Sequence, residues 1–250
     1  MKKVGFLGGG KIGQSLVNHM LEEKSGEAVF IYDPFQSNDV LHGVPVIRSV
    51  EEEDYLGLDL VVECSTAQVV KENAIKVLKH CDFLTFSLTA FQDDDLLAEA
   101  RRTAAKYGTT LYMPHGAILG LDGIFDGRLA FDAISIETIK SPKSLGREDQ
   151  ERTVVYEGSA RGAAIAYPRN VNVHAAVALA GLGFDRTQSK ITSDPSVHTN
   201  EHIIRIKGEG IDFSIHVKSF AAGAVSGKYV PYSACGSLDR VLCKQNISFV

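Results

Sequence analysis

Short apolar runs alternate with segments of helical periodicity over the first 117 residues. Continuous apolar runs are typical of parallel strands buried on both faces, and apolar residues three and four apart are typical of helices. The expected strands are 4–7, 28–32, 58–64, 83–86 and 110–113, and the expected helices are 12–23, 67–80 and 96–108. This alternation predicts an α/β domain, 1–117, with a Rossmann-type parallel sheet covered by helices on both faces.

The pattern changes after residue 117, where strand-like runs outnumber helices. We expect strands at 133–138, 154–156, 188–193, 201–207 and 210–217, a Gly/Ala-rich turn after 156, and a helix at 171–182. These runs predict a second domain, 118–232, of the α+β class with a mixed sheet, which would carry the substrate and catalytic groups. Apolar residues at helical spacing in the tail predict a last helix, about 233–250, that packs back on the first domain.

The turn after the first strand carries a dinucleotide fingerprint. Gly8, Gly10 and Gly13 form G-x-G-x-x-G where a buried strand meets a helix, and Asp33 ends the next strand 20 residues later. The glycines allow a tight turn, close approach of a pyrophosphate and close helix packing, and the acid accepts hydrogen bonds from the ribose. The pattern predicts NAD as cofactor, because Asp33 repels a 2′-phosphate. NADP stays open, because neighbouring residues can compensate.

Ligands of such sheets lie at the carboxyl ends of the strands. The predicted cofactor-binding residues there are Gly8, Gly10, Lys11, Ile12, Gly13, Asp33, Cys64, Ser65 and Ser87.

Composition and charge argue against several classes of binding partner. The 250 residues carry a net charge of −5, which argues against binding to nucleic acid or an anionic membrane. No apolar run approaches the roughly 18 residues of a transmembrane helix, and the first residues do not read as a signal peptide. The four cysteines show neither a C-x-x-C pair nor a metal-ligand spacing, so we expect reduced thiols in the cytoplasm and no metal site.

Two segments of the second domain carry candidate chemistry. His202 ends a polar segment, 194–202, which we expect to be a turn feeding a strand; histidine titrates near neutrality and suits proton transfer. The alternative is a loop histidine bonded to its own turn. Asn170 and Asn172 precede a helix, where an asparagine either caps the helix or contacts the nicotinamide or substrate.

The chain resembles the L-aspartate dehydrogenase family. The resemblance runs from Gly5 to Gly208 through GFLGGGKIG, VVECSTAQVVKE, LTFSLTAFQDDDLL, PHGAILGLDGI, ISIETIKSPKSLG, TVVYEGSA, YPRNVNVHAAVALAG and DPSVHTNEHIIRIKG. It implies NAD(P)-dependent oxidative deamination of L-aspartate, through iminoaspartate, to oxaloacetate and ammonia, with iminoaspartate feeding NAD synthesis in some organisms. It also implies His202 as the acid/base, Ala117 and Asn172 at the nicotinamide, and a homodimer.

The amino-acid substrate needs cations or other donors for its carboxylates. The candidate substrate-binding residues are His115, Lys140, Arg169 and Asn200, with Lys143 as a further cation.

The sequence departs from the family at two places. His115 stands where a serine is usual, and the C-terminal Asn-Pro-Lys-Thr-Ser segment is absent, with 231–233 at best a remnant. Two alternatives therefore stay open: an oxidoreductase that acts on another amino, imino or oxo acid, and a dimer that binds NAD without turnover.

Overall fold

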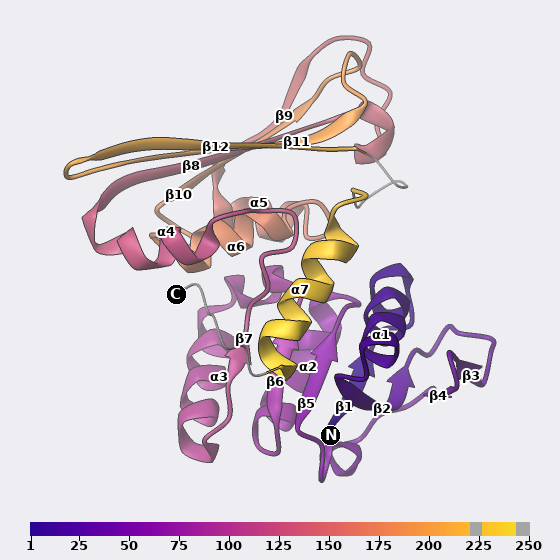
Figure 1. Ribbon diagram of the computed structural model, residues 1–250. Coiled ribbons are helices and arrows are strands. Elements are labelled where there is room, and N and C mark those ends of the chain that lie inside the picture. Colours follow the sequence, from indigo (N-terminus) through magenta and orange to yellow (C-terminus); the bar gives the residue numbers. More distant parts are fainter. Residues whose placement is uncertain (221–226, 244–250) are drawn as a thin grey trace. The chain divides into compact units, whose positions relative to one another are not determined.

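A computed structural model gives the fold, and it describes residues 1–220 and 227–243 (Figure 1). The last seven residues of the predicted tail helix, 244–250, lie outside the described part. The chain divides into two compact units, one made of 1–114 with 231–250 and the other of 115–230. Each unit has its own sheet. The predicted fold class, a Rossmann-type parallel sheet followed by a mixed sheet, is confirmed.

The first unit is built on a seven-stranded sheet in the order β3-β4-β2-β1-β5-β6-β7. All pairs are parallel except β3 with β4. Because the chain runs outward from β1 first to one side and then to the other, the strand order reverses beside β1. Crevices of this kind are where α/β sheets bind ligands. The strands are β1 Lys2–Leu7, β2 Gly26–Tyr32, β3 Val40–Leu41, β4 Val44–Ile47, β5 Leu60–Glu63, β6 Asp82–Thr85 and β7 Leu111–Tyr112.

Local sequence signals set the helix ends of this unit. The helices are α1 Lys11–Glu23, α2 Ala67–Leu78 and α3 Asp94–Tyr107. The Thr66 hydroxyl accepts a hydrogen bond from the Val69 N–H at the start of α2, and the Asp93 carboxylate caps α3. Gly108 ends α3 with φ of 71°, a left-handed conformation that favours glycine.

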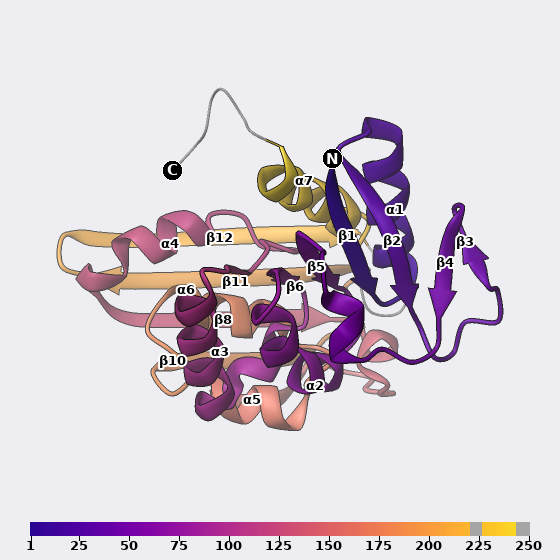
Figure 2. The same cartoon turned by 90° about the horizontal axis from the view of Figure 1, so that it is seen from below.

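The C-terminal helix α7 (Val230–Leu242) packs on the first unit. Ala234 and Leu238 are fully buried in one apolar cluster with residues of β1, such as Phe6, and of α1, such as Leu16. His19 of α1 and Asp239 of α7 add a contact of 2.9 Å between Nε2 and Oδ2. Helices α1 and α7 cover one face of the sheet, and α2 and α3 cover the other (Figure 2).

The second unit is a five-stranded sheet in the order β12-β11-β8-β10-β9. Only β8 and β10 are parallel; the other pairs are antiparallel. Helices α4, α5 and α6 cover one face of this sheet (Figures 1 and 2). The strands are β8 Phe131–Lys140, β9 Thr153–Ser159, β10 Thr187–Ser193, β11 Thr199–Gly208 and β12 Ile211–Phe220, and the helices are α4 Leu121–Gly127, α5 Ala160–Ala166 and α6 Asn172–Ala180. The connections include 3₁₀ turns at Glu52–Tyr55, Leu88–Gln92, Arg128–Ala130 and Pro142–Leu145.

Two expectations for the second unit were wrong. The Gly/Ala-rich segment after β9 is helix α5, not a turn, because the Ser159 hydroxyl caps it by accepting from the Gly162 N–H and because Ala160, Ala163 and Ala164 are buried. The turn predicted at 194–202 is shorter than expected: residues 195–196 form a turn, but strand β11 already begins at Thr199. The strand pairs with β12 from that residue and with β8 from Glu201. His202 is therefore a strand residue.

Candidate active site

The glycine turn of the first unit packs β1 closely against α1 and leaves open space at Gly10. Gly8 has φ of 122°, which strains any other residue. A Cβ on Gly13 would lie 2.0 Å from the Gly8 carbonyl oxygen, so only glycine lets α1 start so close to β1. Gly10, at the N-cap of α1, is exposed with no atom within 4 Å of an added Cβ. The first turn of α1 holds no acid and begins with the exposed Lys11. These features fit a dinucleotide pyrophosphate.

Asp33 lies directly after β2 and is held beside the glycine turn. Its Oδ2 accepts a hydrogen bond of 3.0 Å from the Gly9 N–H, and its Oδ1 accepts one of 3.0 Å from the Phe35 N–H. The carboxylate is half-buried, so part of its acceptor capacity stays open. It thus stands where a ribose hydroxyl of a dinucleotide on this turn would be bound.

A buried carboxylate organises the loops after β5 and β6. Glu63, the last residue of β5, is fully buried and accepts hydrogen bonds from Ser65, Thr85 and Ser87. The Ser87 hydroxyl and N–H lie at 2.8 and 3.0 Å, and the Ser65 N–H at 2.7 Å. Burial raises the pKa of Glu63, and these hydrogen bonds oppose the rise. The carboxylate therefore fixes the two loops that contain the predicted cofactor residues Ser65 and Ser87.

The Cys64 side chain packs against the glycine turn. Its Sγ lies 3.4 Å from the Gly8 carbonyl oxygen and 3.0 Å from a Cβ built on Gly13. Burial, with the charge of Glu63 next, raises the pKa of the thiol well above its usual range. The side chain is thus a neutral packing group next to Gly8 and Gly13. Ile12 of α1 is half-buried and packs against the apolar cluster of this unit.

In the second unit, His202 lies in a buried hydrogen-bonded chain. It is 4% exposed, and its Nδ1 lies 2.9 Å from Thr138 Oγ1 of β8. The same Oγ1 lies 2.6 Å from Nε2 of His174 on α6, whose Nδ1 lies 2.6 Å from Ser189 Oγ on β10. Each of the four side chains comes from a different element of the unit.

Burial keeps both histidines neutral. It lowers the pKa of His202 to about 3, with the positive charge of Lys140 adding to the effect. Burial also lowers the pKa of His174 well below its usual value, followed by the charges of His202 and Lys140. The expected titration of His202 near neutrality was therefore wrong, because that expectation assumed a solvated turn.

Lys140 is the buried cation near these imidazoles. It ends β8, is 3% exposed, and its Nζ lies 3.4 Å from Asn170 Oδ1. Burial lowers the pKa of Lys140 to about 8, so it is mostly charged at neutral pH. A cation in such a site favours an anionic ligand, because a carboxylate would offset the cost of burying the charge.

The other predicted residues of this unit differ in exposure. Asn200 is buried on β11, two residues before His202 and thus on the same face of the sheet. Asn172 is half-buried and is the first residue of α6, whose N-cap position is Val171. His115 and Ala117 are half-buried after β7, whereas Arg169 and Lys143 are exposed.

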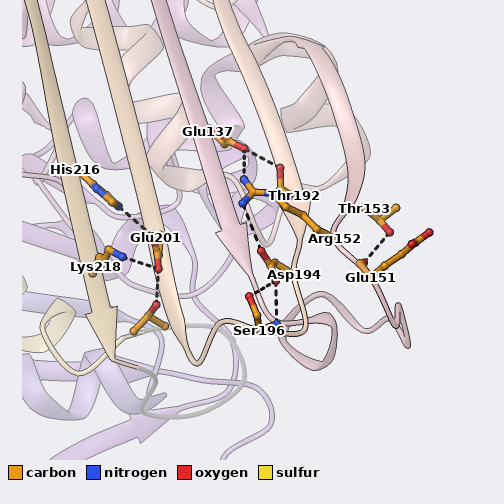
Figure 3. Close-up of polar contacts among 11 residues, drawn as sticks. Glu137, Glu151, Arg152, Thr153, Thr192, Asp194, Ser196, Glu201, His216 and Lys218 are labelled. Atoms are coloured by element: carbon orange, nitrogen blue, oxygen red, sulfur yellow. Dashed lines mark hydrogen bonds and ion pairs between the residues drawn. The ribbon is translucent and has the colours of Figure 1, made fainter.

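The opposite face of the same sheet carries ion pairs. Glu137 of β8 accepts a hydrogen bond of 2.9 Å from the Thr192 hydroxyl and pairs with Arg152, which also reaches Asp194 (Figure 3). Glu201 pairs with His216 and Lys218 of β12 (Figure 3). Because Glu137 and Glu201 alternate with Thr138 and His202, these pairs lie across the sheet from the histidine chain. They tie neighbouring strands together in register.

The described residues contain no group of three or more His, Cys, Asp or Glu side chains arranged to hold a metal ion. Among residues 1–220 and 227–243, no helix has the length and apolarity needed to cross a membrane.

Sequence reasoning missed Glu63, Thr138, His174 and Ser189 as members of these clusters. Signals for two of them were present. Glu63 ends an otherwise apolar run, and His174 lies among apolar residues in α6. Polar residues at such positions are buried and need partners. The partners themselves are far apart in the sequence and only the sheet pairing brings them together.

The comparisons with known proteins cover both units. Residues 8–114 match the family model described as homoserine dehydrogenase, NAD binding domain, and residues 126–241 match that of aspartate dehydrogenase, C-terminal. The chain is 32% identical to the L-aspartate dehydrogenase of Methanococcoides burtonii, with 89% of each chain covered, and 34% identical to that of Thermotoga maritima, with 80% of each covered. The crystal structure of aspartate dehydrogenase from Thermotoga maritima matches with a TM-score of 0.82 and 28% identity over 100% of both chains. The chain belongs to the L-aspartate dehydrogenase family.

Proposed function

We propose that this protein catalyses the NAD(P)-dependent oxidative deamination of L-aspartate to oxaloacetate and ammonia. The observation that carries the proposal is the family match, which extends through both the dinucleotide-binding turn and the unit that holds His202. The buried pair of a neutral imidazole and a cation, His202 and Lys140, supports it, since the reaction moves protons at an amine next to two carboxylates.

Different residues are assigned to cofactor binding and to proton transfer. Bound NAD would supply the acceptor for the hydride that leaves Cα of the substrate. The turn from Gly8 to Gly13 would hold its pyrophosphate, and we assign Ala117 and Asn172 to the nicotinamide. A proton leaves the amine as the C=N bond forms, water adds to the carbon, and ammonia departs. We assign these proton movements to His202.

Substrate binding falls to the second unit in this proposal. Lys140 binds one carboxylate, and His115, Arg169 and Asn200 are the further candidates. Release of iminoaspartate before water adds would provide the route into NAD synthesis that the family resemblance implies.

The direct test is cofactor reduction with L-aspartate, followed at the NADH absorbance. We expect turnover with L-aspartate, and at most weak turnover with amino acids that lack the second carboxylate. Turnover only with another amino or oxo acid would contradict the assigned substrate. Calorimetric NAD binding without reduction by any amino acid would contradict the assignment as an enzyme.

Asp33→Ala is expected to shift cofactor preference toward NADP. The carboxylate repels a 2′-phosphate and accepts from the ribose hydroxyls, so its removal should weaken NAD and strengthen NADP. We expect the ratio of kcat/KM for NAD over NADP to fall by roughly 10- to 100-fold, on the order of one or two charge-assisted hydrogen bonds. The measurement is steady-state kinetics with both cofactors. Asp39→Ala, which removes an exposed carboxylate that pairs with Arg48, is the matched control. An unchanged ratio in Asp33→Ala would refute the ribose assignment.

We further propose a homodimer in the cytoplasm. The family resemblance supports the dimer, and the four free cysteines, Cys64, Cys81, Cys235 and Cys243, support a reducing compartment. Light scattering coupled to gel filtration would give a mass of two chains, and a mass of one chain would contradict the dimer.

A further inference from the structure

We propose that Ser189, His174 and Thr138 form a one-way hydrogen-bond chain that fixes the tautomer of His202, with its proton on Nε2. His202 then presents an N–H donor to the substrate. The consequence for catalysis rests on the proposed function, but the tautomer itself does not. In this proposal Ser189, His174 and Thr138 are positioning residues, which act through His202.

The hydrogen-bond chain is continuous and buried. Its three links measure 2.6 Å from Ser189 Oγ to His174 Nδ1, 2.6 Å from His174 Nε2 to Thr138 Oγ1, and 2.9 Å from Thr138 Oγ1 to His202 Nδ1. All four side chains are 4% exposed or less. Buried donors are almost always hydrogen-bonded, so we expect each donor here to find its acceptor within the hydrogen-bond chain.

The Ser189 end of the hydrogen-bond chain determines the direction in which its protons point. Within the described residues, the Ser189 hydroxyl has one partner, His174 Nδ1, so its proton must point to that nitrogen. His174 then carries its own proton on Nε2 and donates it to Thr138 Oγ1. The Thr138 hydroxyl, already accepting, donates to Nδ1 of His202. A neutral His202 whose Nδ1 accepts must carry its proton on Nε2.

The reverse direction satisfies the same three links but leaves a buried hydroxyl proton unpaired. His202 would donate from Nδ1, Thr138 would donate to His174, and His174 would donate to Ser189. The Ser189 proton would then have no acceptor among the described residues. An unsatisfied buried donor is costly, so the forward direction is favoured.

The charges around the chain oppose an imidazolium. Lys140, on the same strand as Thr138, is a cation, and the described residues place no carboxylate in hydrogen-bond contact with either imidazole ring. A protonated His202 would also need Nδ1 to donate, which reverses the whole chain. The resting state is thus a neutral ring with a donor at Nε2.

This arrangement gives His202 a specific task. Nε2 has no partner among the described residues, and it is not among their fully buried unpaired atoms. It is therefore the nitrogen left for a ligand. A neutral N–H there donates a hydrogen bond to the nitrogen or oxygen at the reacting carbon and polarises it, which is the acid half of the acid/base role assigned to His202.

The tautomers are directly measurable. In protein labelled with ¹⁵N-histidine and saturated with NAD, long-range ¹H–¹⁵N spectra should show His174 and His202 with protonated Nε2 and unprotonated Nδ1 between about pH 6 and 8. His202 with its proton on Nδ1, or as an imidazolium in that range, would overturn the proposal. This spectrum needs no aspartate turnover. A correct tautomer without aspartate oxidation would therefore overturn the proposed function and leave this inference standing.

Thr138→Val and Thr138→Ser form the matched pair. Valine keeps the shape and removes the link, so we expect loss of the single His202 tautomer and a fall in kcat of about 10-fold, the usual lower cost of an outer hydrogen-bond partner. The Kd for NAD should not change. Serine keeps the hydroxyl and should restore both the spectrum and kcat. Wild-type spectra and kcat in Thr138→Val would overturn the proposal.

Ser189→Ala provides a second variant in case Thr138→Val does not fold. It removes the donor that sets the direction, and the deletion of one oxygen leaves little strain. We expect the signals of both tautomers to appear for His174 and His202. Retention of the single wild-type tautomer would contradict the assigned direction.

Discussion

His202→Ala is expected to lower kcat/KM for L-aspartate by roughly 10²- to 10⁴-fold, the usual contribution of a positioned proton-transfer group. The physical reason is that Nε2 of His202 is the imidazole nitrogen left for a substrate in the buried chain of the second unit. The affinity for NAD should stay unchanged, since the glycine turn and Asp33 belong to the other unit. Steady-state kinetics with L-aspartate and calorimetry with NAD check the two halves of this prediction.

Two further substitutions at the same position separate the function of His202 from its size. Glutamine places an amide N–H near the position of Nε2, whereas the shorter asparagine does not reach it. We therefore expect His202→Gln to retain more activity than His202→Asn or His202→Ala. Near-normal turnover in His202→Ala, with NAD binding intact, would remove His202 from the reaction.

The predicted fold followed from strong local signals. The parallel strands of the first unit are apolar runs bounded by polar residues, and the strand expected at 28–32 lies within β2, Gly26–Tyr32. The glycine turn could also be predicted from the sequence. Gly8 is required because its φ is positive, and Gly13 is required because a Cβ there would lie 2.0 Å from the Gly8 carbonyl oxygen. Each of these constraints determines the residue type at one position, so it can be recognised in the sequence.

The hydrogen-bond chain that contains His174 and His202 could not be recognised in this way. Thr138 and His202 are 64 residues apart and meet because β8 and β11 pair antiparallel with these two residues in register. Sequence alone does not give that register, so His202 was placed in a solvated turn and given a normal pKa. Helix α5 was missed for a related reason. Alanines and glycines after Ser159 have weak local preference, and burial against the sheet decides their structure.

Lys140→Met is expected to lower kcat/KM for L-aspartate by about 100-fold, on the order of one desolvated charge pair. Lys140 is 3% exposed at the end of β8, and burial lowers its pKa to about 8. Methionine has similar length and removes a charge that is costly to bury, so the variant should be at least as stable as the wild type. Steady-state kinetics test the expected loss of activity, and thermal unfolding tests the expected retention of stability.

Lys143→Met is the matched control, since Lys143 lies three residues further along the chain and is exposed. We expect it to leave kcat/KM almost unchanged. Equal losses in Lys140→Met and Lys143→Met would point to general electrostatic attraction in place of a bound carboxylate.

The lowered pKa of Lys140 also predicts a pH dependence. The amine is charged below about pH 8 and neutral above it, so the binding of a dicarboxylate should weaken as pH rises through that value. Succinate is the appropriate probe because it has no amine that titrates in the same range. Its Kd for the enzyme with NAD should rise toward 10-fold per pH unit above about pH 8, as linkage requires for one essential proton. In Lys140→Met the Kd should be high and nearly independent of pH across this range. A wild-type Kd that stays constant to about pH 10 would show that the charge of Lys140 does not hold the carboxylate.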